Sequence, residues 1–211
     1  MTQITTTESL PPTRSGSREA IVGAAERLFL IRGFGGVSMD DLAEEAGVAR
    51  RTLYNQFASK EDILREMLLR VSARIGGALP PGIETQGDVE DVLRLIAEAV
   101  LAFQTPTEFV GLVRMAMADA RQFPWIASEF GSVLGPHLER FARYLSYLTS
   151  LGILDCPHPL LAAHQFLGLL NEPTLWQRVL DRDAAPVSPE TVIEEAVGMF
   201  LLRYKSAPAH K

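Results

Sequence analysis

The sequence predicts an all-α protein in which an N-terminal three-helix domain, residues 17–60, precedes a larger helical domain, residues 80–211. Three observations favour this fold class. Apolar residues recur at intervals of three and four from Ser17 onward, no useful stretch alternates apolar and polar residues, and glycine or proline interrupts the pattern at helix-length intervals. Of the 211 residues, 47% are hydrophobic and 22% are charged, a composition typical of globular proteins.

The first 16 residues are expected to form a flexible arm, because they are rich in Thr, Ser, Pro and Gly and have no apolar period. A helix is expected to follow. Ser17 is a candidate N-cap, and Gly33 can adopt the left-handed conformation that ends a helix. The apolar face between them carries Ile21, Ala25, Leu28 and Phe29.

Two short helices are expected next, separated by a glycine turn. Ser38 and Asp41 have the spacing of a capping box at the start of the first, and Gly47 ends it. The second is expected over about residues 50–57, with Leu53 on its buried face. An amphipathic helix followed by two short helices about a tight turn is the arrangement of a helix-turn-helix, whose second helix enters the DNA major groove.

A connecting helix is expected over residues 61–79, because Ser59 and Asp62 repeat the capping-box pattern. Five or six more helices should follow in the larger domain. Pro173 predicts a kink or local break inside one of them. Their expected ranges are about 88–104, 106–120, 124–131, 136–151, 158–180 and 189–205.

The second short helix has an outward face suited to DNA. A bidentate contact between arginine and guanine is worth ~1–3 kcal/mol of discrimination between bases. The simpler alternatives are that the arginines are solvated charges and that the tyrosine is a packing residue. The candidate DNA contacts on this helix are Arg50, Arg51, Thr52, Tyr54, Asn55 and Gln56.

Residues 17–68 resemble the TetR family of bacterial transcriptional regulators. The resemblance rests on an amphipathic first helix followed by GVSMDDLAEEAGV, TLYNQF and SKEDIL at ungapped spacing. It implies that Ser38 and Lys60 contact phosphates and that Thr52 and Tyr54 contact phosphates and base edges. The chain departs from the family pattern with Ala49 in place of a small hydroxyl residue, Arg51 in place of a small residue and Gln56 in place of histidine.

The formal net charge of −6 at first argues against a nucleic-acid partner. The acidic excess is not evenly distributed. Residues 1–60 contain seven basic and seven acidic residues, so residues 61–211 contain 20 − 7 = 13 basic and 26 − 7 = 19 acidic ones. The helix-turn-helix segment is therefore neutral overall, and five of its seven basic residues gather in the arm, the second short helix and the start of the connecting helix. These are Arg14, Arg18, Arg50, Arg51 and Lys60.

The resemblance also implies that residues 80–211 receive a small effector and form a homodimer. Broad apolar stripes favour the helices at 158–180 and 189–205 as the dimer interface. The alternative is that both stripes pack inside one subunit. The stripes consist of Leu160, Ala163, Leu167 and Leu170 in one helix and Val192, Ile193, Ala196, Val197, Phe200, Leu201 and Tyr204 in the other.

An effector pocket should combine a mostly apolar lining with a few polar groups that orient the ligand. The aromatic and pliable apolar residues of the larger domain could supply the lining, although each is equally suited to the core. The polar candidates are interface or core residues in the alternative interpretation. The candidate effector contacts are Phe103, Met115, Trp125, Tyr144, His164 and Asn171.

Other function classes find little support in the sequence. It has no Gly-rich phosphate loop and no histidines at metal-ligand spacing, so we expect no enzyme activity, cofactor or metal. The lone Cys156, the lack of a signal peptide and the lack of an ~18-residue apolar span favour the cytoplasm. The sequence predicts a ligand-responsive transcriptional repressor that binds a pseudo-palindromic DNA operator as a homodimer. The alternative is a ligand-binding or interaction protein of the same fold without operator recognition.

Overall fold

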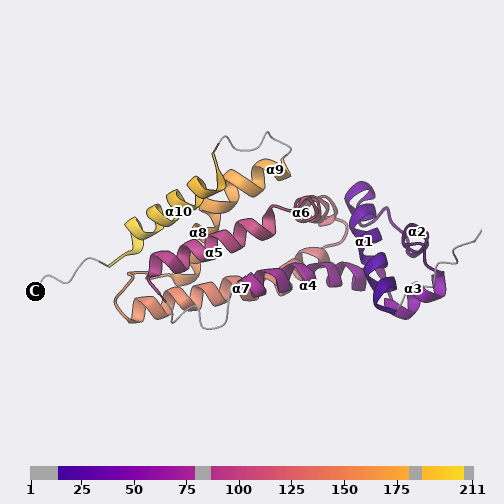
Figure 1. Ribbon diagram of the computed structural model, residues 1–211, viewed down its shortest axis with the longest axis horizontal. Helices are drawn as coiled ribbons and strands as arrows, with labels where there is room; N and C mark the ends of the chain where they lie inside the picture. Colours follow the sequence, from indigo (N-terminus) through magenta and orange to yellow (C-terminus); the bar gives the residue numbers. More distant parts are fainter. Residues whose placement is uncertain (1–13, 79–86, 181–186, 207–211) are drawn as a thin grey trace, which may run out of the picture. The chain divides into compact units, whose positions relative to one another are not determined.

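The computed structural model describes residues 14–78, 87–180 and 187–206, which are predominantly helical (Figure 1). Within these ranges there is no β-strand, only an isolated bridge between Leu154 and Lys205. The chain divides into two compact units, Met1–Met67 and Leu68–Lys211. The predicted all-α class is confirmed.

The first unit contains α1 (Arg14–Arg32), α2 (Met39–Glu45), α3 (Arg50–Gln56) and the start of α4 (Lys60–Ala78). Helices of seven residues are not stable alone in water, so α2 and α3 depend on what they bury. Each inserts a leucine into a shared core. The fully buried side chains of this core include Phe29, Phe34, Leu42, Leu53 and Leu64.

Helix α1 begins earlier than the sequence suggested. Residues 14–16, which we assigned to the flexible arm, are already helical, and the rest of that arm lies outside the described residues. The prediction of Ser17 as N-cap is wrong, because Ser17 lies inside α1 and is buried. It shares the spacing of Ile21 and Ala24, so its small side chain continues the buried face toward the N-terminus.

The predicted glycine turns and the capping box of α2 are confirmed. Gly33 and Gly47 adopt φ values of 71° and 64°, the left-handed region in which glycine is favoured. Ser38 accepts a hydrogen bond from the Asp41 amide, while the Asp41 carboxylate accepts one from the Ser38 amide at 2.8 Å. Both ends of α2 are therefore specified by local chemistry.

The second unit contains the end of α4 and α5 (Val89–Gln104), α6 (Thr107–Asp119), α7 (Trp125–Ser150), α8 (Pro159–Asn171), α9 (Gln177–Val179) and α10 (Pro189–Tyr204). Helix α7 packs against α8, and α5 packs against α10 (Figure 1). Their buried faces form one core with Phe166 near its middle. The ring of Phe166 meets Phe141 and Phe200 edge to face, with centroids 5.4 and 5.2 Å apart.

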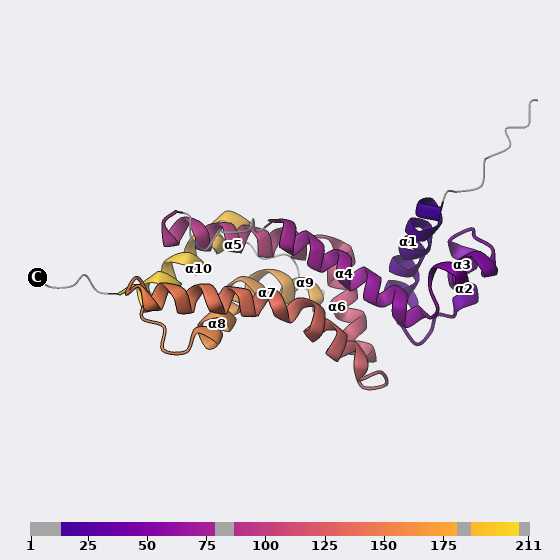
Figure 2. The ribbon, with the colours of Figure 1, turned by 90° about the horizontal axis from the view of Figure 1, so that it is seen from below.

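Helix α7 replaces two expected helices. We expected a break between residues 131 and 136, yet the chain remains helical through Pro136 (Figure 2). Proline removes one helix hydrogen bond and bends the helix, which accounts for the curved ribbon. The break is avoided because residues on both sides of Pro136, including Ile126 and Leu145, are buried in the unit.

The kink or local break expected at Pro173 takes the form of a change in helical register. A π-helical turn, η2 (Glu172–Trp176), separates α8 from α9. Proline has no amide hydrogen to donate, and the wider π register accommodates its ring without ending the helix. The Thr174 hydroxyl donates to the Leu170 carbonyl oxygen at 2.6 Å within this turn.

The apolar stripes predicted for dimerisation mostly pack inside a single chain, as the alternative interpretation held. All seven residues of the stripe on α10 are buried within the chain itself. On α8, Ala163 and Leu170 are buried, Leu167 is half-buried and Leu160 is exposed. The stripes are wide because each helix is covered by several neighbours of its own subunit.

No single described helix is both long and apolar enough to cross a membrane. Only α5 and α6 taken together reach the required length and composition, and they meet at an angle of 75°.

Candidate functional site

Helix α3 exposes a polar face while one residue anchors it. Leu53 is fully buried, and Phe57, the C-cap residue, is nearly so. The six candidate DNA contacts cover the remainder of the helix. Arg50, Arg51, Tyr54 and Asn55 are exposed, and Thr52 and Gln56 are half-buried.

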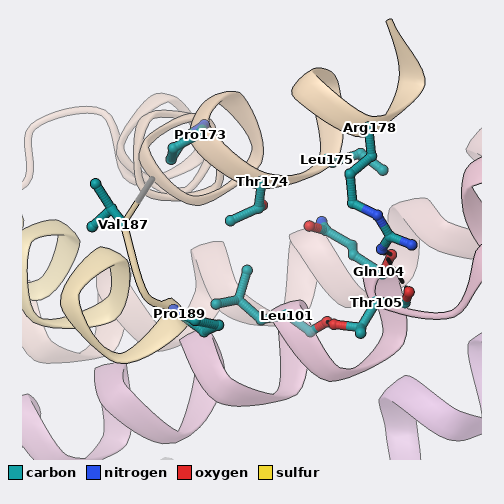
Figure 3. A pocket seen from close by; sticks show the side chains of 9 residues that line it. All are labelled: Leu101, Gln104, Thr105, Pro173, Thr174, Leu175, Arg178, Val187 and Pro189. Carbon is teal, nitrogen blue, oxygen red and sulfur yellow. Dashed lines mark hydrogen bonds between the residues drawn. The ribbon is translucent and has the colours of Figure 1, made fainter. Parts of the chain in front are cut away.

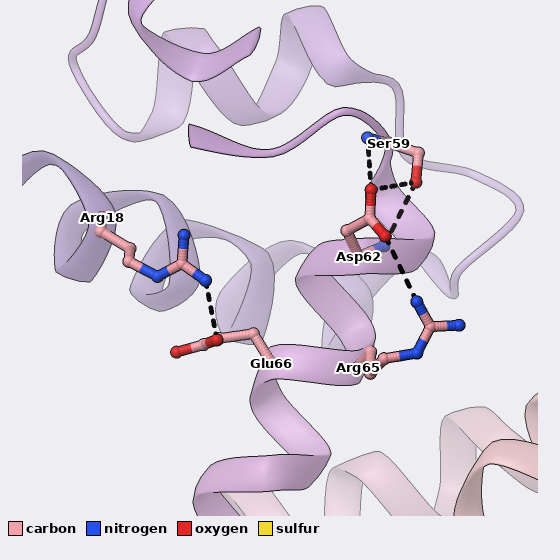
Figure 4. Close-up of polar contacts among 5 residues, drawn as sticks. All are labelled: Arg18, Ser59, Asp62, Arg65 and Glu66. Carbon is pink, nitrogen blue, oxygen red and sulfur yellow. Dashed lines mark hydrogen bonds and ion pairs between the residues drawn. The ribbon is translucent and has the colours of Figure 1, made fainter. Parts of the chain in front are cut away.

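Arg18 of α1 ties α3 to the start of α4, and Figure 4 shows its ion pair with Glu66 of α4. Its Nη1 donates to the Gln56 carbonyl oxygen at 3.1 Å, and its Nη2 lies 2.8 Å from Glu66 Oε2. The guanidinium also lies over the Phe57 ring, 4.2 Å from its centroid. Arg18 therefore binds the C-terminal end of α3, where helix carbonyl groups have no partner within the helix.

We expected Arg18 to lie with the basic residues available to DNA, whereas its side chain binds the end of α3. The spacing of apolar residues in α1 does indicate that Arg18 faces inward. Arg18 lies three and seven residues before Ile21 and Ala25, both of which are buried, so it belongs to the inner face of α1. Arginine can extend along such a face and direct its donors to buried carbonyl groups.

The start of α4 has its own capping box, also visible in Figure 4. The Asp62 amide donates to Ser59 Oγ at 3.2 Å, and the Ser59 amide donates to the Asp62 carboxylate at 3.1 Å. Arg65 pairs with the other oxygen of Asp62 at 3.3 Å. The second predicted capping box is therefore confirmed.

The arginines of the first unit differ in how freely they can meet a phosphate or a base. Among those whose side chains the structure describes, Arg51 alone has no carboxylate partner. The ion pairs of the exposed arginines are worth ~0–1 kcal/mol each, so they can be exchanged for phosphate. These pairs join Arg27 to Glu45 at 2.8 Å, Arg32 to Asp41 at 3.1 Å and Arg50 to Asp40 at 2.9 Å.

Ser38, Tyr54 and Lys60 meet around one shallow depression between α2, α3 and α4. Lys60 Nζ donates to the carbonyl oxygens of Phe34 and Val37, both at 2.9 Å, and so ties down the α1–α2 connection. Lysine has three donors, so one remains for a phosphate.

The hydroxyl of Ser38 is engaged with Asp41. Hydrogen bonds from its side chain and its amide, together with the charge of Arg32, lower the pKa of Asp41. Asp41 therefore stays ionised and keeps the cap formed. Ser38 and Lys60 both have structural roles, and their phosphate contacts stay predictions.

None of the six candidate effector contacts lines the cavity that described residues form at the end of α5. Tyr144 and Met115 are buried, and Phe103 packs edge to face on Phe109 with centroids 5.0 Å apart. Trp125 is half-buried at the start of α7, whereas His164 is exposed on α8. Of the six, Asn171 alone is linked to the cavity described next.

A cavity of about 280 Å³ lies between the end of α5, η2 with α9, and the start of α10 (Figure 3). No local pattern in the sequence indicates this cavity, because its lining residues come from three separate segments. Gln104 is 5% exposed and points its amide into this space, and its Nε2 donates to Asn171 Oδ1 at 2.6 Å. The lining residues are Leu101, Gln104, Thr105, Pro173, Thr174, Leu175, Arg178, Val187 and Pro189.

Two family models match the chain. Residues 21–67 match bacterial regulatory proteins of the tetR family, and residues 91–206, more than half of the chain, match the C-terminal domain of AefR-like transcriptional repressors. The chain belongs to the TetR family.

Relatives agree with this family assignment. The HTH-type transcriptional regulator EthR of Mycolicibacterium smegmatis is 24% identical over 194 residues, which are 92% of this TetR-family chain and 88% of EthR. A TetR-family regulator from Pseudomonas syringae pv. tomato is 30% identical with a TM-score of 0.70, covering 89% of this chain and 96% of that one. The flavonoid-responsive regulator FrrA is 27% identical with a TM-score of 0.73, covering 92% and 100%.

As a TetR-family member, the chain is a DNA-binding transcriptional regulator and not an enzyme. Within the described ranges, no group of three or more His, Cys, Asp or Glu side chains could hold a metal ion.

Proposed function

We propose that this chain is a cytoplasmic repressor that binds a pseudo-palindromic operator as a homodimer and is released by a small, mostly apolar effector. The outward polar face of α3 carries this proposal, since two arginines at its start suit base edges and phosphates. The match to AefR-like transcriptional repressors supports repression over activation. Two copies of α3 about 34–36 Å apart would read successive major grooves.

Within this proposal, the residues of α3 divide into two roles. No described carboxylate pairs with Arg51, so it is the main candidate for a base contact. Arg50 must first leave Asp40, which makes its net contribution smaller. Thr52, Tyr54 and Asn55 complete the base-facing set. Ser38, Gln56 and Lys60 would contact phosphates at its edge.

Binding to the DNA that flanks the chain's own gene tests operator recognition. Affinity should fall steeply with salt, because log K changes by about −0.9 per phosphate contact for each unit of log salt. Arg51→Ala should weaken binding by roughly tenfold to a hundredfold, the equivalent of ~1–3 kcal/mol. Unfolding should be nearly unchanged, since Arg51 is exposed and has no ion pair.

The matched control is Arg143→Ala in the second unit, which removes an equally exposed arginine in an i, i+4 pair with Glu139. This control should bind DNA like the wild type. Equal losses in both variants, or binding that does not respond to salt, would contradict recognition through α3 and favour an interaction protein of this fold.

Dimerisation through α8 and α10 remains our proposal, but through their outward faces. Leu202 is 90% exposed on α10, with Met199 beside it and Leu161 exposed on α8. A Cβ added to Gly168 or Gly198 would meet no atom within 4 Å, so the helix backbone is open to solvent at both positions. Glycines beside exposed apolar side chains allow the helices of a second copy to approach these helices closely.

Sedimentation of the full chain tests the interface. Leu202→Glu should shift a dimer to the monomer, because it would place a charge in the centre of the apolar contact. Ile31→Glu is the control, since Ile31 is another exposed apolar residue, 79% exposed, and lies on α1 of the first unit. Retention of the dimer by Leu202→Glu would refute this interface.

Release by an effector requires that the effector bind the released conformation more tightly than the DNA-bound one. The name of the relative FrrA states that it responds to flavonoids, which supports a small, mostly apolar effector for this chain. The expected result is that a cognate effector lowers operator affinity. Tight effector binding without any change in operator affinity would contradict the coupling.

A further inference from the structure

The buried Gln104 side chain presents an acceptor that no described residue satisfies. Its Oε1 is buried and has no hydrogen-bond partner. Its Nε2 is engaged with Asn171 Oδ1, which holds the amide in one orientation and directs Oε1 toward the cavity (Figure 3). Leaving a buried acceptor without a donor costs about 1–3 kcal/mol, so such groups call for a partner.

The other polar groups of the cavity cannot supply that donor. The hydroxyl hydrogen of Thr174 is committed to the Leu170 carbonyl oxygen, and that of Thr105 to the Leu101 carbonyl oxygen at 2.7 Å. Both hydroxyls therefore present only lone pairs to the cavity. Together with Gln104 Oε1 they place three acceptors on one side of the cavity, while the donors of the lining belong to Arg178.

Arg178 is held away from Gln104 Oε1 by the main chain. Its Nη1 donates to the carbonyl oxygens of Gln104, at 3.1 Å, and of Thr105. These bonds link α9 to the end of α5 and close one end of the cavity. The Arg178 guanidinium therefore forms part of the cavity lining and is held in place by these bonds.

The rest of the lining is apolar. Leucine, proline and valine side chains from α5, η2, Val187 and the start of α10 face the acceptors (Figure 3). A volume of about 280 Å³ lies just below the ~300–1,000 Å³ of most ligand pockets, so the ligand must be small. The apolar residues are Leu101, Pro173, Leu175, Val187 and Pro189.

We propose that this cavity is the effector site, and that it selects a small apolar molecule carrying a hydroxyl group that donates a hydrogen bond to Gln104 Oε1. This inference rests on the proposed effector-responsive function. It defines the ligand by a donor on an apolar body, that is, an alcohol or a phenol. An ether of the same shape has no donor for Gln104 and leaves the acceptor buried without a partner.

Calorimetry of the full chain with 2-naphthol and 2-methoxynaphthalene tests this selectivity. The two probes share one apolar body and differ in whether the oxygen carries a hydrogen or a methyl group. Naphthol should bind about tenfold more tightly, the equivalent of one neutral hydrogen bond to a buried acceptor. Equal binding, tighter binding of the ether, or no binding of either probe would overturn the inference.

Variants locate the binding to this cavity. Gln104→Met removes the acceptor and should abolish the preference for naphthol while the ether still binds. Because that change leaves Asn171 without its partner, the double variant Gln104→Met with Asn171→Leu replaces the pair by apolar groups and avoids a new unsatisfied atom. Gln122→Met, at an exposed glutamine between α6 and α7, is the control and should keep the preference.

The same titrations separate this inference from the proposed function. A preference for naphthol that is lost in both Gln104 variants would confirm the cavity as the binding site. If naphthol bound there without changing operator affinity, that result would contradict only its role as an effector. A preference for naphthol that survives in the double variant would overturn the site.

Discussion

Replacing Arg18 by alanine should loosen the recognition helix α3 without unfolding the rest of the chain. The substitution removes the donor to the Gln56 carbonyl oxygen, the ion pair with Glu66 and the guanidinium over the Phe57 ring. All three contacts belong to the first unit, and two of them involve the last turn of α3.

The magnitude follows from these contacts. A hydrogen bond from a charged group contributes about 1.5–3 kcal/mol, and a partly exposed cation–π contact about 0.5–1 kcal/mol. The Arg18 side chain is 38% exposed, so solvent screens its pair with Glu66 and the sum must be discounted. A net cost of about 2 kcal/mol corresponds to roughly thirtyfold more frequent opening of α3.

Amide hydrogen exchange of the full chain measures this opening directly. Peptides covering residues 50–57 should exchange about thirtyfold faster in Arg18→Ala, whereas peptides covering residues 141–148 of α7 should not change. Arg18→Lys should give an intermediate result, because one ammonium cannot reproduce the planar fork of the guanidinium.

Arg27→Ala is the matched control for this experiment. It removes an arginine from the same helix together with an exposed ion pair to Glu45, and it has no hydrogen bond to α3. Exchange in α3 should be nearly unchanged in this variant. Unchanged exchange in Arg18→Ala, or equal acceleration in both variants, would refute a positioning role for Arg18.

Three further outcomes are expected. Ser38→Ala should lower the free energy of unfolding by about 1 kcal/mol in urea titrations, because α2 loses its cap; no loss would contradict that role. Phe166→Ala should cost about 3–5 kcal/mol, followed by tryptophan fluorescence, since its ring is fully buried among aromatic partners; a loss below 1 kcal/mol would mean that the core closes around it. Burial, and then the charge of Arg140, lower the pKa of His137 below 6.5 in the folded chain. As the pH falls, His137 therefore binds a proton in the unfolded chain before it does so in the folded chain. Stability should be complete above about pH 6.5 and decline below it, and a decline of the same size in His137→Asn would exclude this histidine as the cause.

Local signals in the sequence predicted the first unit well. The capping boxes at Ser38 and Ser59 and the glycine turns at Gly33 and Gly47 all appear in the structure. Each depends on residues three or four positions apart, so its chemistry is complete within the local sequence. The same locality allowed the polar face of α3 to be identified as the candidate DNA contact.

Signals that depend on distant packing were less informative. Pro136 indicated a helix break, but burial of α7 on both sides of it outweighs one lost hydrogen bond. Ser17 had the identity of a cap residue and instead packs inside α1. The stripe on α10 indicated an interface between subunits, yet it is covered by helices of its own chain.

The sequence by itself determined the helical class, the helix-turn-helix and the residues that α3 presents, because periodicity and caps act within a few residues. Only the tertiary structure decided where Arg18 and Gln104 direct their side chains. Arg18 finds its partners 38 and 48 residues away, and Gln104 finds Asn171 67 residues away. Contacts across such separations arise when helices pack, so no local pattern contains them.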